Sequence, residues 1–443
     1  MNRLVMTLLL ATLWTSIATA QGPIQAYVGA RLIPIDGPEI PNGTMLVQDG
    51  KILAIGPKDD IQIPPRAEFL DYTGTVIMPG LICTHSHIGG IGGADSSSPM
   101  QPDVRIYDSI NVRDSGFRRA VAGGLTTLNI MPGSGHLLSG QTVYVKLRGA
   151  EGEARTIDDL FILDEDGEIM GGIKMANGTN PMRSAPFPGT RGKAAAIVRD
   201  RFIQAQEYQE KIKRAAGDPS KMPKRDIGLE AVVKVLEGKW VVHHHTHRHD
   251  DIMTVIRLSK EFGFRVVLHH VSEAWKVADE IAAAGVGCSA ILIDAPGGKL
   301  EAVGLALETG AALEKAGVLT AFHTDDYITD SRLFLRMAAL GVRGGMSREG
   351  ALKAVTLAGA IMLDLDHRIG SLTPGKDADF VVLSGDPLSV YTRVLMTYVE
   401  GKRVFDIRNE KDKLYAVGGY GAGHDQSPYF CCFSHLMEMG GAQ

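Results

Sequence analysis

The middle of the chain alternates between short apolar runs and amphipathic stretches. Runs rich in β-branched residues predict buried strands, and apolar residues at helical spacing predict helices between them. The predicted strands are 125–130, 143–147, 172–176, 240–245, 265–270, 287–293 and 318–323, and the clearest helices are 251–262, 272–284 and 300–316. Strand–helix units at this spacing predict an α/β fold built on a (β/α)₈ TIM barrel, with a doubly wound sheet as the alternative.

Both ends of the chain show a different pattern of short apolar runs and turns. Asp49-Gly50 is a hairpin signal within 21–75, and 366–412 contains runs at 379–383 and 394–399. We therefore predict a small composite β-sandwich domain from 21–75 plus 366–412. The barrel domain is predicted at 76–365, and 413–443 is predicted to be an irregular tail.

One segment interrupts the regular alternation of the barrel. Residues 180–226 begin with turn residues and continue as a charged helix at 193–214. Because this insertion follows a strand end, we expect that it could cover a site there, with a solvated surface helix as the alternative.

The first twenty residues predict a cleavable secretory signal peptide. Arg3 precedes a short apolar core, and Ala18-Thr19-Ala20 forms a small-residue cleavage site before Gln21. The apolar core is too short to span a membrane, although an uncleaved anchor is the alternative. We expect a periplasmic or secreted mature protein without a membrane segment.

Composition agrees with a soluble enzyme. Of 443 residues, 44% are hydrophobic and 22% are charged, and the net charge of −5 provides no basic field for nucleic acid. The cysteines lack metal-clip or disulfide-framework spacing, and Cys83 and Cys288 are expected in the core.

The candidate chemistry lies where the predicted strands end. His85 and His87 follow an apolar run, and residues i and i+2 of an extended chain face the same side, where imidazoles can bind zinc. A lone H-x-H motif is weak evidence for a metal site. Three later strand ends strengthen it, because they carry the His/Asp-rich run 243–251, His269-His270 and 323–326. A surface metal-scavenging tract is the compositional alternative for the first of these runs.

These motifs resemble the amidohydrolase superfamily. The resemblance rests on His85-Ser86-His87 after Met78-Pro79-Gly80-Leu81-Ile82, on one histidine in each of two later strands, on Asp325, and on the return segment 370–383. It covers about 25–406 and is closest to the imidazolonepropionase-like and Xaa-Pro dipeptidase-like branches, which share the pattern at 245–248. The motifs are specific for the superfamily and unspecific for substrate.

The resemblance implies a ligand set and catalytic roles. His85, His87 and Asp325 would hold one zinc ion, His245 and His270 a second, and a carboxylated Lys174 would bridge them. Some relatives have a ligand glutamate where this chain has Thr179, so one ion is the alternative to two. Asp325 would also be the catalytic acid–base group. His247 and His323 would bind substrate or orient a ligand.

These residues predict an exported, metal-dependent amidohydrolase that cleaves C–N bonds in a small molecule or short peptide. A dipeptidase or N-acyl amino acid amidase is favoured, a cyclic amide hydrolase (imidazolone- or hydantoin-like) comes second, and a lactonase or organophosphate hydrolase third. A non-catalytic His-rich metal-binding protein is the alternative from another class. The sequence is compatible with a homo-oligomer.

Overall fold

The computed structural model describes residues 22–91, 95, 97–149, 156–292, 300–326 and 328–417. The predicted signal peptide at 1–20 and the cysteine pair Cys431-Cys432 lie outside these ranges. Across the described residues, no helix has the length and apolar character that crossing a membrane requires.

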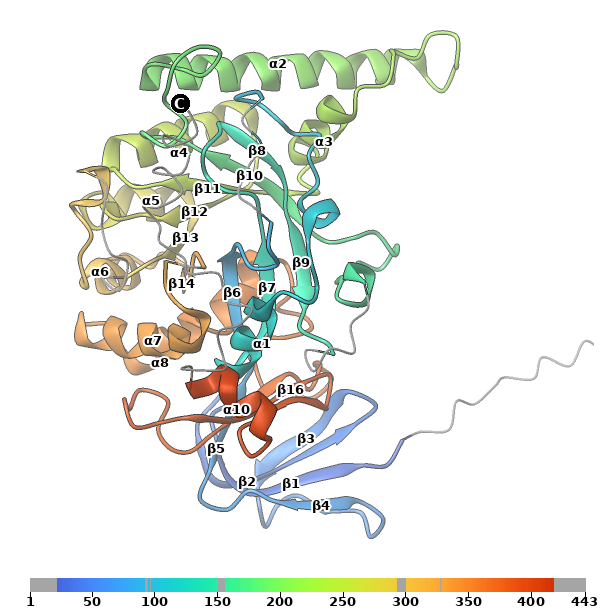
Figure 1. Cartoon of the computed structure of the whole chain (residues 1–443), viewed down its shortest axis with the longest axis vertical. Coiled ribbons are helices and arrows are strands. Elements are labelled where there is room, and N and C mark those ends of the chain that lie inside the picture. Colours follow the sequence, from blue (N-terminus) through green and yellow to red (C-terminus); the bar gives the residue numbers. More distant parts are fainter. Residues whose placement is uncertain are drawn as a thin grey trace, which may run out of the picture.

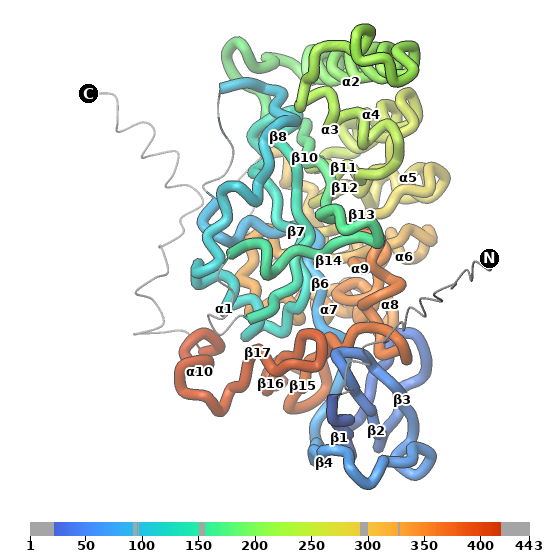
Figure 2. The backbone as a smooth tube through the Cα atoms, turned by 90° about the vertical axis from the view of Figure 1, so that its right-hand side faces the viewer, coloured from blue at the N-terminus to red at the C-terminus, as the bar shows by residue number. Residues whose placement is uncertain are grey.

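The two ends of the chain share one eight-stranded sheet (Figures 1 and 2). Its strands are β1 (Gln25–Leu32), β2 (Ile40–Gln48), β3 (Lys51–Pro57), β4 (Glu68–Asp71), β5 (Val76–Pro79), β15 (Phe380–Leu383), β16 (Val394–Val399) and β17 (Lys402–Asp406). The strand order is β17-β16-β15-β5-β1-β2-β3, with β4 beside β1. Antiparallel pairing of β5 with β15 joins the two ends, and Tyr27, Phe380 and Tyr398 pack together in the core of this unit.

Gly80 separates the terminal sheet from the strand that carries the first histidines. Its N–H donates to the Asp379 carbonyl oxygen in the terminal sheet, whereas the N–H of Leu81 donates to Gly124 in the central part. A Cβ at position 80 would lie 2.3 Å from the Thr126 side chain, so only glycine fits. The run from residue 76 therefore forms two strands, and β5 belongs to the terminal sheet instead of the domain predicted to begin at 76.

The central part contains two sets of parallel strands among the described residues, two strands in one hydrogen-bonded sheet and five in another. They are β6 (Leu81–Ser86), β7 (Leu125–Ile130), β10 (Gly172–Ala176), β11 (Val241–Thr246), β12 (Val266–His270), β13 (Gly287–Ala290) and β14 (Thr320–Phe322). One sheet has the order β14-β13-β12-β11-β10-β8, and the other has the order β6-β7-β9.

Two antiparallel strands lie between β7 and β10. β8 (Leu138–Gln141) pairs with β10, and β9 (Val143–Lys146) pairs with β7. Only Thr142 separates them, so one nearly continuous segment contributes to both sheets. The sequence predicts β9 but not β8, because Ser139 and Gly140 interrupt its apolar pattern.

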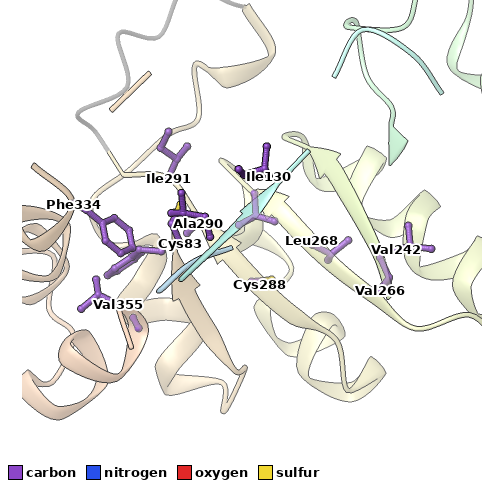
Figure 3. Close-up of a cluster of buried hydrophobic side chains, with 14 of the residues drawn as sticks. Cys83, Ile130, Val242, Val266, Leu268, Cys288, Ala290, Ile291, Phe334 and Val355 are labelled. Atoms are coloured by element: carbon purple, nitrogen blue, oxygen red, sulfur yellow. The ribbon is translucent and has the colours of Figure 1, made fainter. Parts of the chain in front are cut away.

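Short helices accompany the parallel strands (Figure 1). They are α1 (Ser115–Ala122), α4 (His249–Phe262), α5 (Ala278–Ala284), α6 (Thr309–Lys315), α7 (Phe334–Arg343), α8 (Arg348–Ala354) and α9 (Leu357–Met362), with 3₁₀ turns η1 (Ile106–Ser109), η2 (Ile157–Asp159), η3 (Ala274–Lys276), η4 (Leu300–Ala302) and η5 (Ser331–Leu333). Side chains from strands and helices form a common apolar core (Figure 3). Cys83 and Cys288 are free and buried in it, as predicted.

The insertion predicted at 180–226 contains α2 (Arg191–Ala215), and α3 (Ile227–Leu236) follows it in the crossover from β10 to β11. The buried side of α2 contains Ala194, Val198, Phe202 and Ala205 at helical spacing. The Phe202 ring lies 5.1 Å from the rings of both Phe262 and Phe264. The helix therefore packs on α3 and α4 (Figure 1) and is not a free surface helix.

The chain beyond 406 ends in a helix within the described residues. α10 (Glu410–Val417) extends five residues into the segment 413–443 that the sequence predicts to be irregular. Residues 418–443 lie outside the described part of the chain.

Candidate metal centre

The first group of polar side chains lies where β6 and β14 end. The backbone N–H of Asp325 donates to the His85 carbonyl oxygen at 3.1 Å, which places the two strand ends side by side. Asp325 Oδ1 lies 3.2 Å from His85 Nε2 and 3.0 Å from His87 Nε2, and the two imidazole nitrogens are 3.1 Å apart. Three potential ligand atoms thus converge on one point.

This triangle fits a divalent metal ion. Zinc bonds of about 2.0–2.2 Å place neighbouring ligand atoms about 3–3.5 Å apart around one ion, close to the separations found here. His87 Nδ1 lies 2.7 Å from the Met131 carbonyl oxygen, which fixes this ring with Nε2 directed at Asp325. The donor set of two imidazoles and one carboxylate is one that zinc accepts.

Lys174 adjoins this group from β10. Its side chain is fully buried, and Nζ lies 3.0 Å from His85 Nε2 and 3.2 Å from Met131 Sδ. Lys174 Nζ is therefore a direct neighbour of a candidate ligand in the first group.

A second group lies beside the first. His245, His247 and His270 have ligand atoms within 4.8 Å of one another. Nε2 of His270 is buried and has no hydrogen-bond partner among the described residues, as expected for an atom available to a metal. The ligand atom of His247 is thus as close to the other two as they are to each other, within the same 4.8 Å limit. The sequence predicts a different role for His247, namely contact with substrate or orientation of a ligand.

His323 adjoins both groups, and its ligand atom lies within 4.8 Å of those of His85 and His270. It is fully buried, its ring stacks on His85 at a centroid distance of 4.8 Å, and its Nε2 lies 3.2 Å from His270 Nδ1. Its Nδ1 lies 2.8 Å from the Ser289 hydroxyl. This burial favours an orienting role over direct substrate contact.

Two of the candidate ligands stand on backbone conformations that L-residues rarely adopt. The φ angles are +71° at His270, +47° at Val271 and +49° at Asp325. A non-glycine residue in this region costs of the order of 1–3 kcal/mol, and such residues cluster at functional sites. The chain turns sharply after β12 and β14, and this turn directs the His270 and Asp325 side chains toward the other groups.

Electrostatics favours the ionisation states that metal ligands need. Burial lowers the pKa of His85 and His270 well below the ordinary value and that of His323 to about 3, which keeps these rings neutral. Burial alone would raise the pKa of Asp325, but His270 and the hydrogen bond from His87 outweigh it and lower the pKa. Neutral imidazoles around a carboxylate form a cation site.

The structure adds polar side chains that sequence reasoning missed. His243 and His269 lie in the interior near His85, and both are visible in the sequence as neighbours of candidate ligands. Asp326 accepts hydrogen bonds from Ser86 and Ser331, tying the end of β6 to the loop after β14. Adjacent residues of a strand point to opposite faces, so the strand register decides which histidine of a neighbouring pair can be a ligand and which supports it.

A family model described as "Amidohydrolase family" matches residues 76–404, from β5 to β17. This chain belongs to the amidohydrolase family. Amidohydrolase tasK of Hapsidospora irregularis is 26% identical over 391 residues, which cover 82% of this chain and 40% of tasK, less than half its length. Imidazolonepropionase of Symbiobacterium thermophilum is 23% identical over 384 residues, covering 79% of this chain and 85% of that enzyme.

A solved structure agrees with this assignment. An amidohydrolase from Thermotoga maritima MSB8 matches with a TM-score of 0.79 and 33% identity, covering 86% of this chain and 99% of that one. The predicted superfamily is thus confirmed. The protein has a mixed α/β fold, belongs to a family of hydrolases, and contains histidine clusters suited to a metal ion.

Proposed function

We propose that this amidohydrolase is exported and cleaves C–N bonds of small molecules or short peptides with the help of divalent metal ions. The observation that carries the proposal is the convergence of His85 Nε2, His87 Nε2 and Asp325 Oδ1 within 3.0–3.2 Å of one another. Lys174 and the His245, His247 and His270 group adjoin this point, and we propose that they hold a second ion.

Each side chain has a role in this proposal. Divalent ions bound here would supply Lewis acidity and a nucleophile at neutral pH. Asp325 would accept the proton of the nucleophile and deliver it to the leaving nitrogen. His87 and Asp325 have side chains 18% and 17% exposed, whereas His85 is fully buried, so substrate would approach on the side of His87 and Asp325.

The proposed scaffold is a (β/α)₈ barrel with its third strand reversed. β8 and β9 join at Thr142 and pair with β10 and β7, so together they fill the position between these two strands. The bond from Asp325 N–H to the His85 carbonyl oxygen supports a second seam, between β14 and β6. In such a barrel the catalytic groups meet at the carboxyl ends of the strands.

Two substrate classes compete. We favour open-chain amides, namely dipeptides or N-acyl amino acids, because the predicted export would bring the enzyme into contact with them. The relationship to imidazolonepropionase favours ring opening of a cyclic amide as the second candidate. Both reactions need the same nucleophile and the same proton transfer by Asp325.

A hydrolysis panel separates the two classes. Zinc-loaded protein beginning at Gln21 would be assayed with dipeptides, N-acyl amino acids, hydantoins, imides and lactams. Cleavage of open-chain amides that is lost in Asp325→Asn would support the favoured class. Ring opening alone would overturn it in favour of the cyclic class, and equal hydrolysis by the variant would refute the role given to Asp325.

We also propose that residues 1–20 direct export and are then removed. Expression of the full chain followed by cell fractionation and N-terminal sequencing would test this. A mature N-terminus at Gln21 outside the cytoplasm is expected. A chain that keeps Met1 in the cytoplasm would contradict it.

A further inference from the structure

A row of buried rings runs from the candidate ligand His85 into the interior of the protein. His85 Nδ1 lies 3.3 Å from His269 Nδ1, and His269 Nε2 lies 3.1 Å from His243 Nδ1. The row ends where His243 Nε2 meets the Tyr144 hydroxyl at 2.9 Å. The three histidines are fully buried and Tyr144 is 2% exposed, so these groups bond to one another instead of to bulk water.

Each neutral imidazole in this row has one N–H donor and one lone-pair acceptor. If His85 Nε2 binds a metal ion, the hydrogen of His85 must be on Nδ1, and His269 Nδ1 must accept it. The hydrogen of His269 is then on Nε2 and is donated to His243 Nδ1. His243 in turn donates from Nε2 to the Tyr144 oxygen.

Only one other arrangement satisfies all three hydrogen bonds, and it is the reverse. Tyr144 would donate to His243, His243 to His269, and His269 to His85. The hydrogen of His85 would then be on Nε2, the atom directed at His87 and Asp325. In that arrangement His85 has no lone pair for a metal ion.

The other imidazole of the triangle is held differently. His87 Nδ1 faces the Met131 carbonyl oxygen, which can only accept a hydrogen bond. A carbonyl therefore fixes the His87 tautomer by itself. His269 can donate or accept at Nδ1, so on this side of the ring the tautomer of His85 depends on the groups behind His269. On the other side Lys174 Nζ lies 3.0 Å from His85 Nε2, and it no longer donates as an ammonium once it is carboxylated as proposed.

We propose that His269, His243 and Tyr144 form a positioning chain that holds His85 in the Nδ1–H tautomer needed to bind a divalent ion. The proposal rests on the metal-dependent function proposed above. Partners of this kind, behind a metal-binding histidine, change metal affinity by about 10–100-fold when they are removed. Here the partner of His85 is His269, an imidazole whose own tautomer has to be fixed. The effect on metal affinity should therefore extend through His269 to His243 and Tyr144.

Substitutions at position 269 separate hydrogen bonding from packing. His269→Leu removes both the acceptor and the donor, whereas His269→Gln retains one of each. His244→Leu is the matched control, because His244 is equally buried but its Nδ1 faces the carbonyl oxygen of His245 and is outside the row. Zinc affinity would be measured by competition with a chromophoric chelator, and the melting temperature would be measured on zinc-free protein.

We expect His269→Leu to lose about 10–100-fold in zinc affinity at the tighter site. His269→Gln should recover most of this loss, and His244→Leu should bind zinc as the wild type does. Equal zinc affinity in wild type and His269→Leu would overturn the proposal, and so would a loss of the same size in His244→Leu. A wild-type protein that binds no zinc would instead refute the proposed function itself.

A second measurement does not depend on whether the leucine variant folds. In zinc-loaded wild type with ¹⁵N-labelled histidine, NMR should show the hydrogen on Nε2 of both His269 and His243.

Tyr144→Phe should also weaken zinc binding, because the His243 Nε2–H loses its acceptor. The loss of zinc affinity should be smaller than in His269→Leu. A hydrogen on Nδ1 of His269 in the zinc-loaded protein would overturn the proposal.

Discussion

Asp325 combines a strained backbone, a lowered pKa and contacts to two imidazoles. Asn has nearly the same shape but cannot accept a proton, so Asp325→Asn should lower kcat by about 10²–10⁴-fold through the lost proton transfer. Steady-state kinetics with circular dichroism on the same sample would check this. Asp330→Asn is the matched control. Asp330 lies in the same loop and caps η5, and because an asparagine can also cap this turn, the variant should retain activity. Turnover of Asp325→Asn near that of the control would contradict the assignment.

In the proposed function, Lys174 decides whether the site holds one ion or two. Its Nζ lies 3.0 Å from His85 Nε2, and a carboxylated Lys174 would add oxygen ligands between the two histidine groups. Elemental analysis of purified protein should therefore find two zinc ions per chain in wild type and one in Lys174→Ala. Finding one ion in both proteins would remove the bridging role of Lys174.

At the scale of elements, the sequence predicts strands best where they are apolar and end in histidine. β12 (Val266–His270) lies within the predicted 265–270, and β11 (Val241–Thr246) is shifted by one residue from the predicted 240–245, because the apolar residues before the histidines indicate a buried parallel strand. The break at Gly80 and the short β8 depend on contacts with Thr126 and β10, which are distant in the sequence. The residue types at the strand ends were enough to predict the candidate site. The row of hydrogen-bonded rings from His269 to Tyr144 could be recognised only from the strand register in the structure.

The packing of α2 gives a prediction for the insertion. Phe202 is fully buried against Phe262 and Phe264, so Phe202→Ala should lower the free energy of unfolding by about 3–5 kcal/mol. Ile203→Ala is the matched control, because this neighbour is 46% exposed and should change stability by less than about 0.5 kcal/mol. Urea unfolding would measure both variants. Equal stability of the two would show that α2 does not depend on its packed face.

The same variants test whether α2 takes part in the reaction. The helix packs on α3 and α4, so Phe202→Ala protein that remains folded should keep its kcat and its zinc content. A selective fall in kcat without loss of stability would instead support the covering role that the insertion's position after β10 suggested.

At the scale of the whole molecule, Lys146 connects the central part to the terminal sheet. This β9 side chain is 1% exposed and pairs with Asp377, with Asp379 at 3.1 Å and with Glu400 at 3.3 Å. Burial would raise the pKa of Asp377 and Glu400, but Lys146 and, for Glu400, the hydrogen bonds from Arg148 lower both to about 2. For Asp379, burial prevails and the pKa is raised.

Replacing Lys146 should therefore destabilise the protein in a pH-dependent way. Lys146→Met leaves buried carboxylates without their shared cation, which costs about 3–5 kcal/mol at pH 7. Asp377 and Glu400 have folded pKa values below their ordinary values of 3.8 and 4.5, so the stability they contribute is present above about pH 4.5 and is lost as the pH falls toward 2. The difference in the free energy of unfolding between wild type and Lys146→Met should consequently become smaller as the pH falls through that range.

Urea unfolding at pH 7 and at pH 4 would measure this narrowing. Lys221→Met is the matched control, because Lys221 pairs with Asp218 on the surface and its loss should leave stability unchanged at both pH values. A constant difference at both pH values would mean that Lys146 acts through packing of its aliphatic stem. A narrowing difference would show that charge pairing across β9, absent from any local sequence pattern, stabilises the junction between the two parts of the molecule.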